Sequence, residues 1–67
     1  DAEGKFVWKN GEAAFAFGNK HKGKTLREVV RSDRGYINWM VDKGNFGADV
    51  MRICREALEG KFPEKKA

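Results

Sequence analysis

Residues 6–17 of the chain read FVWKNGEAAFAF, which is two short apolar-rich runs joined by Asn10-Gly11. Asn-Gly is the strongest short-range signal for a β-hairpin, because both central residues of a type I′ turn need a positive φ. With Asn10-Gly11 as the loop, Trp8 pairs with Ala13, and the two runs place their aromatic side chains on one face. These side chains are Phe6, Trp8, Phe15 and Phe17. The stretch therefore predicts an N-terminal hairpin whose aromatic face packs against a core.

Three short helical patterns follow the hairpin. Thr25-Leu26-Arg27-Glu28 fits a capping box, so the first helix begins at Thr25. The second covers residues 34–43 with Asp33 as its N-cap, and the third covers residues 47–59, where apolar residues recur at helical spacing. An isolated hairpin is marginally stable, so the helices must cover it. The predicted fold is α+β, an N-terminal β-hairpin packed against three short helices in residues 1–62, with a tail at residues 63–67.

The residue types that catalysis or metal binding would need are scarce in this chain. Its one cysteine, Cys54, excludes an internal disulfide and falls in an apolar helical stripe, so we expect it to be buried. Its one histidine is His21, and its acidic residues show no spacing for a metal site. We therefore predict no catalytic residue, no metal and no cofactor, and we interpret the chain as a domain that is not itself an enzyme.

The net charge of +4 is concentrated in one stretch of the sequence. Residues 18–34 hold six Lys or Arg against two acidic residues, which also gives +4, whereas residues 1–17 carry −1 and residues 35–67 carry +1. A positive field confined in this way favours a polyanionic partner, and phosphate is the commonest candidate.

The basic stretch opens with a loop at residues 18–24, which has two glycines and no apolar side chain. Its lysines and the helix N-terminus that follows can meet a phosphate together; the alternative is a solvated charged turn. Residues 18–25 also fit the spacing G-x-x-x-x-G-K-[ST], but a nucleotide-binding loop needs a parallel strand before it and a larger domain around it. We therefore interpret the loop as a nucleic-acid contact and not as a nucleotide site.

Aromatic residues complete the candidate site. Most of them belong to the core in so small a domain, and we expect Tyr36 and Trp39 to be the exceptions that reach the surface and stack on bases. We expect the His21 imidazole to be exposed to solvent or to face phosphate. The predicted nucleic-acid-binding residues are Lys20, His21, Lys22, Lys24, Arg27, Arg31, Arg34, Tyr36 and Trp39.

Four stretches resemble the C-terminal domain of exonuclease X-like bacterial 3′-5′ exonucleases. They are Phe15-Ala16-Phe17-Gly18, residues 20–29 (KHKGKTLREV), residues 33–40 (DRGYINWM) and residues 57–63 (ALEGKFP). Asn19 is an additional residue relative to the family pattern, and Arg34 stands where the family usually has proline. The resemblance implies an accessory domain that is covalently linked to an acidic-residue, metal-dependent exonuclease domain.

Targeting signals are missing from the sequence. No apolar run approaches the roughly 20 residues of a membrane span, and the start Asp1-Ala2-Glu3 is unlike a secretory signal. We therefore expect a cytoplasmic location and no membrane partner. Because the sequence does not begin with Met and its tail is typical of a linker, we expect it to be a fragment of a longer protein.

The leading interpretation is a non-catalytic module that binds nucleic acid, DNA in preference to RNA, and tethers it for the linked exonuclease domain. The alternative is a protein-docking module of a DNA replication or repair nuclease, which would use exposed Tyr36, Trp39 and Phe62. Salt separates the two interpretations, because phosphate binding weakens steeply with ionic strength and an apolar interface does not.

Overall fold

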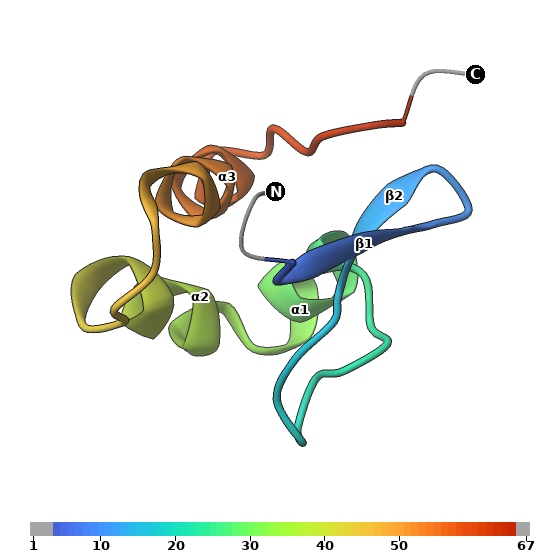
Figure 1. The fold of residues 1–67 in the computed structure, drawn as a ribbon. Coiled ribbons are helices and arrows are strands. Elements are labelled where there is room, and N and C mark those ends of the chain that lie inside the picture. Colours follow the sequence, from blue (N-terminus) through green and yellow to red (C-terminus); the bar gives the residue numbers. More distant parts are fainter. Residues whose placement is uncertain (1–3, 66–67) are drawn as a thin grey trace.

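The computed structural model describes residues 4–65, and it confirms the α+β prediction of one hairpin followed by three helices (Figure 1). Strands β1 (Phe6–Lys9) and β2 (Glu12–Phe15) form an antiparallel two-stranded sheet. The helices are α1 (Leu26–Ser32), α2 (Arg34–Asp42) and α3 (Ala48–Leu58). Each helix lies within one or two residues of its predicted bounds.

The hairpin has the register that the Asn-Gly turn predicts. Trp8 lies opposite Ala13, and Phe6 lies opposite Phe15. The two turn residues have positive φ angles, 53° at Asn10 and 82° at Gly11, as a type I′ turn requires. The turn chemistry therefore fixes which side chains of the hairpin share a face.

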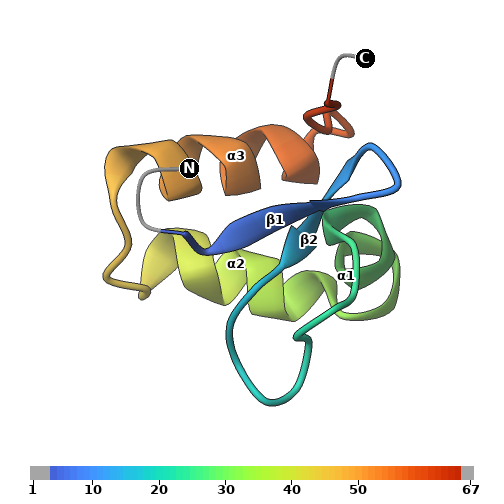
Figure 2. The same ribbon diagram turned by 45° about the vertical axis from the view of Figure 1, so that its right-hand side comes forward.

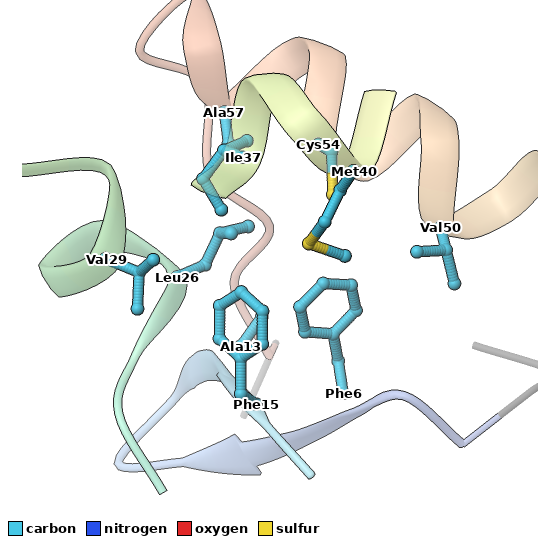
Figure 3. Close-up of a cluster of buried hydrophobic side chains, with 10 residues drawn as sticks. All are labelled: Phe6, Ala13, Phe15, Leu26, Val29, Ile37, Met40, Val50, Cys54 and Ala57. Carbon is cyan, nitrogen blue, oxygen red and sulfur yellow. The ribbon is translucent and has the colours of Figure 1, made fainter. Parts of the chain in front are cut away.

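The core lies between the hairpin and the helices. The rings of Phe6 and Phe15 meet edge to face, with their centroids 5.2 Å apart. Figure 3 shows both rings pointing from the strands toward the side chains of the helices. The buried apolar residues of the cluster are Phe6, Ala13, Phe15, Leu26, Val29, Ile37, Met40, Val50, Cys54 and Ala57. The chain has one cysteine and therefore no internal disulfide, so burial of this apolar cluster is the main source of its stability.

Trp8 corrects the expectation that all four aromatic residues of the hairpin face the core. Its side chain is 47% exposed, although it shares a face with Phe6 and Ala13. Trp8 is one pair from the turn, and its side chain lines a hollow beside Ile53 and Pro63 that no side chain of the described residues fills. Ala14 belongs to the other face and is also buried, and Thr25 forms a bridge with it.

The capping box at the start of α1 is present as predicted. The Glu28 N–H donates to the Thr25 hydroxyl at 3.1 Å, and the Thr25 N–H donates to the Glu28 carboxylate at 3.4 Å. Cys54 is buried in α3 as expected, and this burial raises the pKa of its thiol to about 11. Asp33 is the N-cap residue of α2, but its side chain makes no capping hydrogen bond.

The segment after α3 returns to the hairpin. Glu64 forms a bridge with Glu12, and the Lys65 N–H donates to the Gly11 carbonyl at 2.9 Å. The first part of the predicted tail at residues 63–67 is therefore held against the turn, and residues 66–67 lie outside the described residues. None of the helices in the described part of the chain is both long and apolar enough to span a membrane.

The capping box gives a test of the fold. Replacing Thr25 with Ala removes the hydroxyl that accepts from the Glu28 N–H, and we expect a loss of about 1 kcal/mol of unfolding free energy. For a domain of this size, that loss corresponds to a fall of about 4–8 °C in the melting temperature. Thr25→Ser keeps the hydroxyl and serves as the control. Equal melting temperatures for Thr25→Ala and Thr25→Ser would contradict the role of the cap.

Candidate nucleic-acid interface

The basic loop leaves β2 at Phe15 and returns to the outer edge of the same strand. The Phe15 N–H donates to the Lys24 carbonyl at 2.9 Å, and the Gly23 N–H donates to the Phe15 carbonyl at 2.8 Å. Gly23 has a φ of 89°, which an L side chain rarely adopts, so glycine permits the turn there. Figure 2 shows the loop projecting away from the helices while both of its ends stay at the hairpin. The loop is therefore fixed at its base.

The buried side chain of His21 holds the loop at a second point. Its side chain is only 3% exposed and packs beside the rings of Phe15 and Tyr36, with centroid distances of 6.1 and 4.7 Å. Its Nε2 lies 2.9 Å from the Asp33 carboxylate. An ionised carboxylate only accepts hydrogen bonds, so Nε2 is the donor. The other ring nitrogen, Nδ1, is buried without a hydrogen-bond partner among the described residues.

The expectation of an exposed His21 is therefore wrong. The pocket that buries the imidazole is built by Phe15 of β2 and Tyr36 of α2, six residues before and fifteen residues after His21. A histidine in a run of lysines and glycines gives no sign of such a pocket. With almost no exposed surface, the His21 side chain positions the loop, and we leave it out of the proposed interface.

Asp33 holds two side chains of the loop at once. The same carboxylate oxygen lies 2.9 Å from His21 Nε2 and 3.1 Å from Lys20 Nζ. Hydrogen bonds from Lys20 and His21 to the ionised form lower the pKa of the Asp33 carboxyl. This use of the carboxylate explains why it does not cap α2. Asp33 was predicted only as a helix cap, and nothing in the sequence around it indicates its role in the loop.

Three of the six predicted cations make contacts within the domain. Lys20 pairs with Asp33, and the Arg27 guanidinium pairs with Glu12 at 3.1 Å. Arg27 also lies over the ring of Phe62, 4.4 Å from the centroid. The Arg34 guanidinium donates to the carbonyl of Leu58, the last residue of α3, at 2.6 Å. These contacts join separate elements of the fold, so the three cations contribute to its assembly.

The other three cations, Lys22, Lys24 and Arg31, are exposed and form no ion pair within residues 4–65. Two of them meet at an open hollow of about 340 Å³ beside α1. We name this feature the basic hollow; it is lined by Lys24, Glu28, Arg31 and Ser32. Its one carboxylate, on Glu28, is engaged by the backbone and hydroxyl of Thr25. The basic hollow therefore contains two cationic side chains that form no ion pair within the described residues.

The two aromatic residues of the predicted site lie side by side on α2. The rings of Tyr36 and Trp39 are 5.8 Å apart and inclined at 33°. Trp39 is 49% exposed, as expected, whereas Tyr36 is partly buried against the core and His21. Trp39 is thus the residue of this pair with an open ring surface. Within the described residues, no three His, Cys, Asp or Glu side chains gather as a possible metal site.

Comparison with protein families gives a match at residues 15–47 to the family described as exodeoxyribonuclease X-like C-terminal. Over these residues, which are just under half of the chain, the sequence is similar to that family. The matched segment of the chain contains the whole basic loop, α1 and α2, and hence His21, Asp33 and Trp39. No curated protein and no solved structure matches the chain. The resemblance drawn from the sequence is therefore confirmed at the level of the family.

The shared carboxylate makes the stability of the domain depend on pH. A carboxyl group whose pKa is lowered by folding contributes stability above its unfolded pKa of about 3.9, and this stability is lost as the pH falls through the lowered pKa. We expect Asp33→Asn to be less stable than the unmodified protein at pH 5. We expect the difference to shrink below about pH 4, where the native carboxyl also becomes neutral.

Urea unfolding midpoints measured from about pH 5 down to about pH 2.5 test this prediction. Asp42→Asn is the matched control, because Asp42 is an exposed aspartate on the same helix and forms no ion pair within residues 4–65. A difference between Asp33→Asn and the unmodified protein that stays constant over this range would show that the carboxylate charge is not what holds the loop.

Proposed function

We propose that this domain binds nucleic acid without sequence specificity and holds it for a covalently linked 3′-5′ exonuclease domain. The observation that carries the proposal is the division among the cations of the basic stretch. Lys20, Arg27 and Arg34 make contacts that join elements of the fold, whereas Lys22, Lys24 and Arg31 are exposed and form no ion pair among the described residues. The family match supports the connection with an exonuclease.

Phosphate is the group that the unpaired cations Lys22, Lys24 and Arg31 would bind. Exposed Lys and Arg side chains attract the nucleic-acid backbone irrespective of sequence, and they supply most of the affinity of non-specific binding. The anchors at the base of the loop and at His21 hold the loop that carries Lys22 and Lys24, and Lys24 shares the basic hollow with Arg31. Less chain entropy is lost on binding when the contacts are already positioned. The start of α1 is left out of this interface, because the Thr25 hydroxyl already accepts from the Glu28 N–H.

Trp39 adds an apolar contact to the proposed interface. Its ring is about half exposed and rests against Tyr36, so it can take an unpaired base on its open surface. Stacking of a base on an aromatic side chain tolerates any sequence, because every base has a π-face. In this proposal, DNA is the ligand, phosphate contacts give the affinity, and Trp39 contributes a sequence-independent contact to a single-stranded part.

Cleavage is assigned in this proposal to the linked catalytic domain, because the family match is to a C-terminal domain and not to the nuclease domain. We expect the purified 67-residue chain to release no nucleotides from single- or double-stranded DNA in the presence of Mg²⁺. Gel analysis of end-labelled DNA checks this expectation. Release that persists through purification and is abolished by a point substitution in these residues would contradict it.

The alternative is protein docking through the exposed aromatic residues. Trp39 favours it, because an exposed tryptophan is a common anchor of protein interfaces. Phe62 does not add to such a surface, since it is partly buried and lies beneath Arg27. The response of binding to salt decides between the two functions.

A salt titration tests the proposed phosphate contacts. If Lys22, Lys24 and Arg31 each neutralise about one phosphate, log K should fall with log salt with a slope of about −2 to −3. Replacing Lys22 and Lys24 with Ala should weaken binding to all sequences alike and flatten the slope by about 1.4 to 1.8. Fluorescence anisotropy of a labelled oligonucleotide measures both effects.

The matched control removes two positive charges from elsewhere on the surface. Lys43 and Arg55 are exposed and form no ion pair among the described residues, and they lie at the end of α2 and on α3. We expect the double Ala variant at these positions to bind almost as the unmodified chain does. Equal losses from the two double variants would show that net charge alone is responsible. A slope near zero would favour docking through Trp39.

A further inference from the structure

The basic hollow contains a carboxylate as well as its two cations. It is lined by Lys24 at the end of the loop and by Glu28, Arg31 and Ser32 on α1. Lys24 and Arg31 are exposed, and neither side chain forms a hydrogen bond or ion pair within residues 4–65. The proposed phosphate contacts therefore lie beside a negative charge, which opposes the approach of phosphate.

The spacing of Glu28 and Arg31 favours an ion pair that the structure does not contain. The two residues are three positions apart on α1, and side chains at this spacing are neighbours on a helix surface. The Glu28 Oε1 instead accepts from the Thr25 hydroxyl at 3.2 Å and from the Thr25 N–H at 3.4 Å. The capping box thus turns the carboxylate toward Thr25, and Arg31 stays unpaired within the described residues.

The charge of Glu28 can be separated from its role in the cap. Glutamine has a carbonyl oxygen that can accept from the same hydroxyl and N–H, and both Glu and Gln occur at this position of a capping box. A negative charge in the first turn of a helix adds only a small stabilisation. Glu28→Gln therefore keeps the hydrogen bonds of the cap and removes the charge from the basic hollow.

We propose that Glu28 limits the affinity of the basic hollow for the nucleic-acid backbone, and that the Thr25 cap keeps its carboxylate away from Arg31. This inference rests on the proposed function and names a residue that sets the strength of binding at the same site. A phosphate at the basic hollow is attracted by Lys24 and Arg31 and repelled by Glu28. A moderate affinity suits a tether, because electrostatic, sequence-independent contacts let a protein slide along the strand.

Coulomb's law gives the size of the expected effect. At a separation of about 6 Å in a dielectric near that of water, one unit of repulsion weakens binding about threefold. We therefore expect Glu28→Gln to bind a labelled thymidine oligonucleotide about threefold more tightly than the unmodified chain does. Fluorescence anisotropy at low salt measures this gain. The gain should shrink as salt is added, because mobile ions screen an exposed charge, whereas a purely structural effect of the substitution would not depend on salt in this way.

Asp49→Asn is the matched control for the change in net charge. Asp49 is exposed in the first turn of α3, outside the basic hollow, and it forms no ion pair within residues 4–65. Its substitution removes one negative charge, as Glu28→Gln does. We expect the affinity of Asp49→Asn for the oligonucleotide to be almost that of the unmodified chain.

A second set of variants releases the carboxylate from the cap. Thr25→Ala removes the hydroxyl that donates to Glu28 and allows the carboxylate to pair with Arg31. We expect Thr25→Ala to bind about twofold more weakly than Thr25→Ser, which keeps the hydroxyl. In the double variant Thr25→Ala/Glu28→Gln this loss should disappear, because glutamine has no charge with which to pair. Thermal melts establish that each variant is folded at the temperature of the measurement.

Two results would overturn the inference. One is binding by Glu28→Gln that is equal to or weaker than binding by the unmodified chain at low salt. The other is an equal gain in Asp49→Asn, which would make net charge alone responsible. A loss in Thr25→Ala that persists in the double variant would refute the role of the cap. If neither the unmodified chain nor Glu28→Gln binds DNA at low salt, the proposed function fails, and this inference fails with it.

Discussion

The hydrogen bond between His21 and Asp33 is the contact on which the arrangement of the basic surface depends. It joins the middle of the loop to the junction between α1 and α2, at a position where the imidazole is covered by Phe15 and Tyr36. The same Asp33 oxygen also lies 3.1 Å from Lys20 Nζ, so one carboxylate connects the buried His21 with the exposed Lys20. Besides this contact, residues 18–24 are held by their pairing with β2, by the hydrogen bond from Lys9 Nζ to the Gly23 carbonyl and by the ion pair of Lys20 with Asp33. With these contacts, the loop has a defined position against α1.

This anchoring separates structural charges from those available to a ligand. A basic stretch with a net charge of +4 appears uniform in the sequence. In the fold, Lys20, Arg27 and Arg34 each contact another element, whereas Lys24 and Arg31 line the basic hollow and Lys22 is exposed on the loop. Exposed ion pairs contribute little to stability one by one, but they fix the geometry in which the other charges are presented. A tethering domain needs a positioned electrostatic surface and no deep pocket.

Local chemistry allowed much of the fold to be predicted from the sequence. The Asn10-Gly11 turn determined the strand register, and the Thr25 to Glu28 capping box determined the start of α1, because both are short-range backbone requirements. The site was less predictable. The pocket around His21 combines residues from β2, the loop and α2, and the exposure of Trp8 depends on how far the core extends along the hairpin.

In the proposed function, nucleic acid binds at the loop, at α1 and at Trp39, and not over the whole charged surface. Mapping the backbone amide shifts of the isotope-labelled chain during titration with an unlabelled thymidine oligonucleotide tests this claim most directly. We expect the largest shift changes at Lys22, Gly23, Lys24, Arg31 and Trp39, with the amides of Lys43 and Arg55 almost unchanged. Changes spread evenly over all lysines and arginines, or centred on α3, would contradict it.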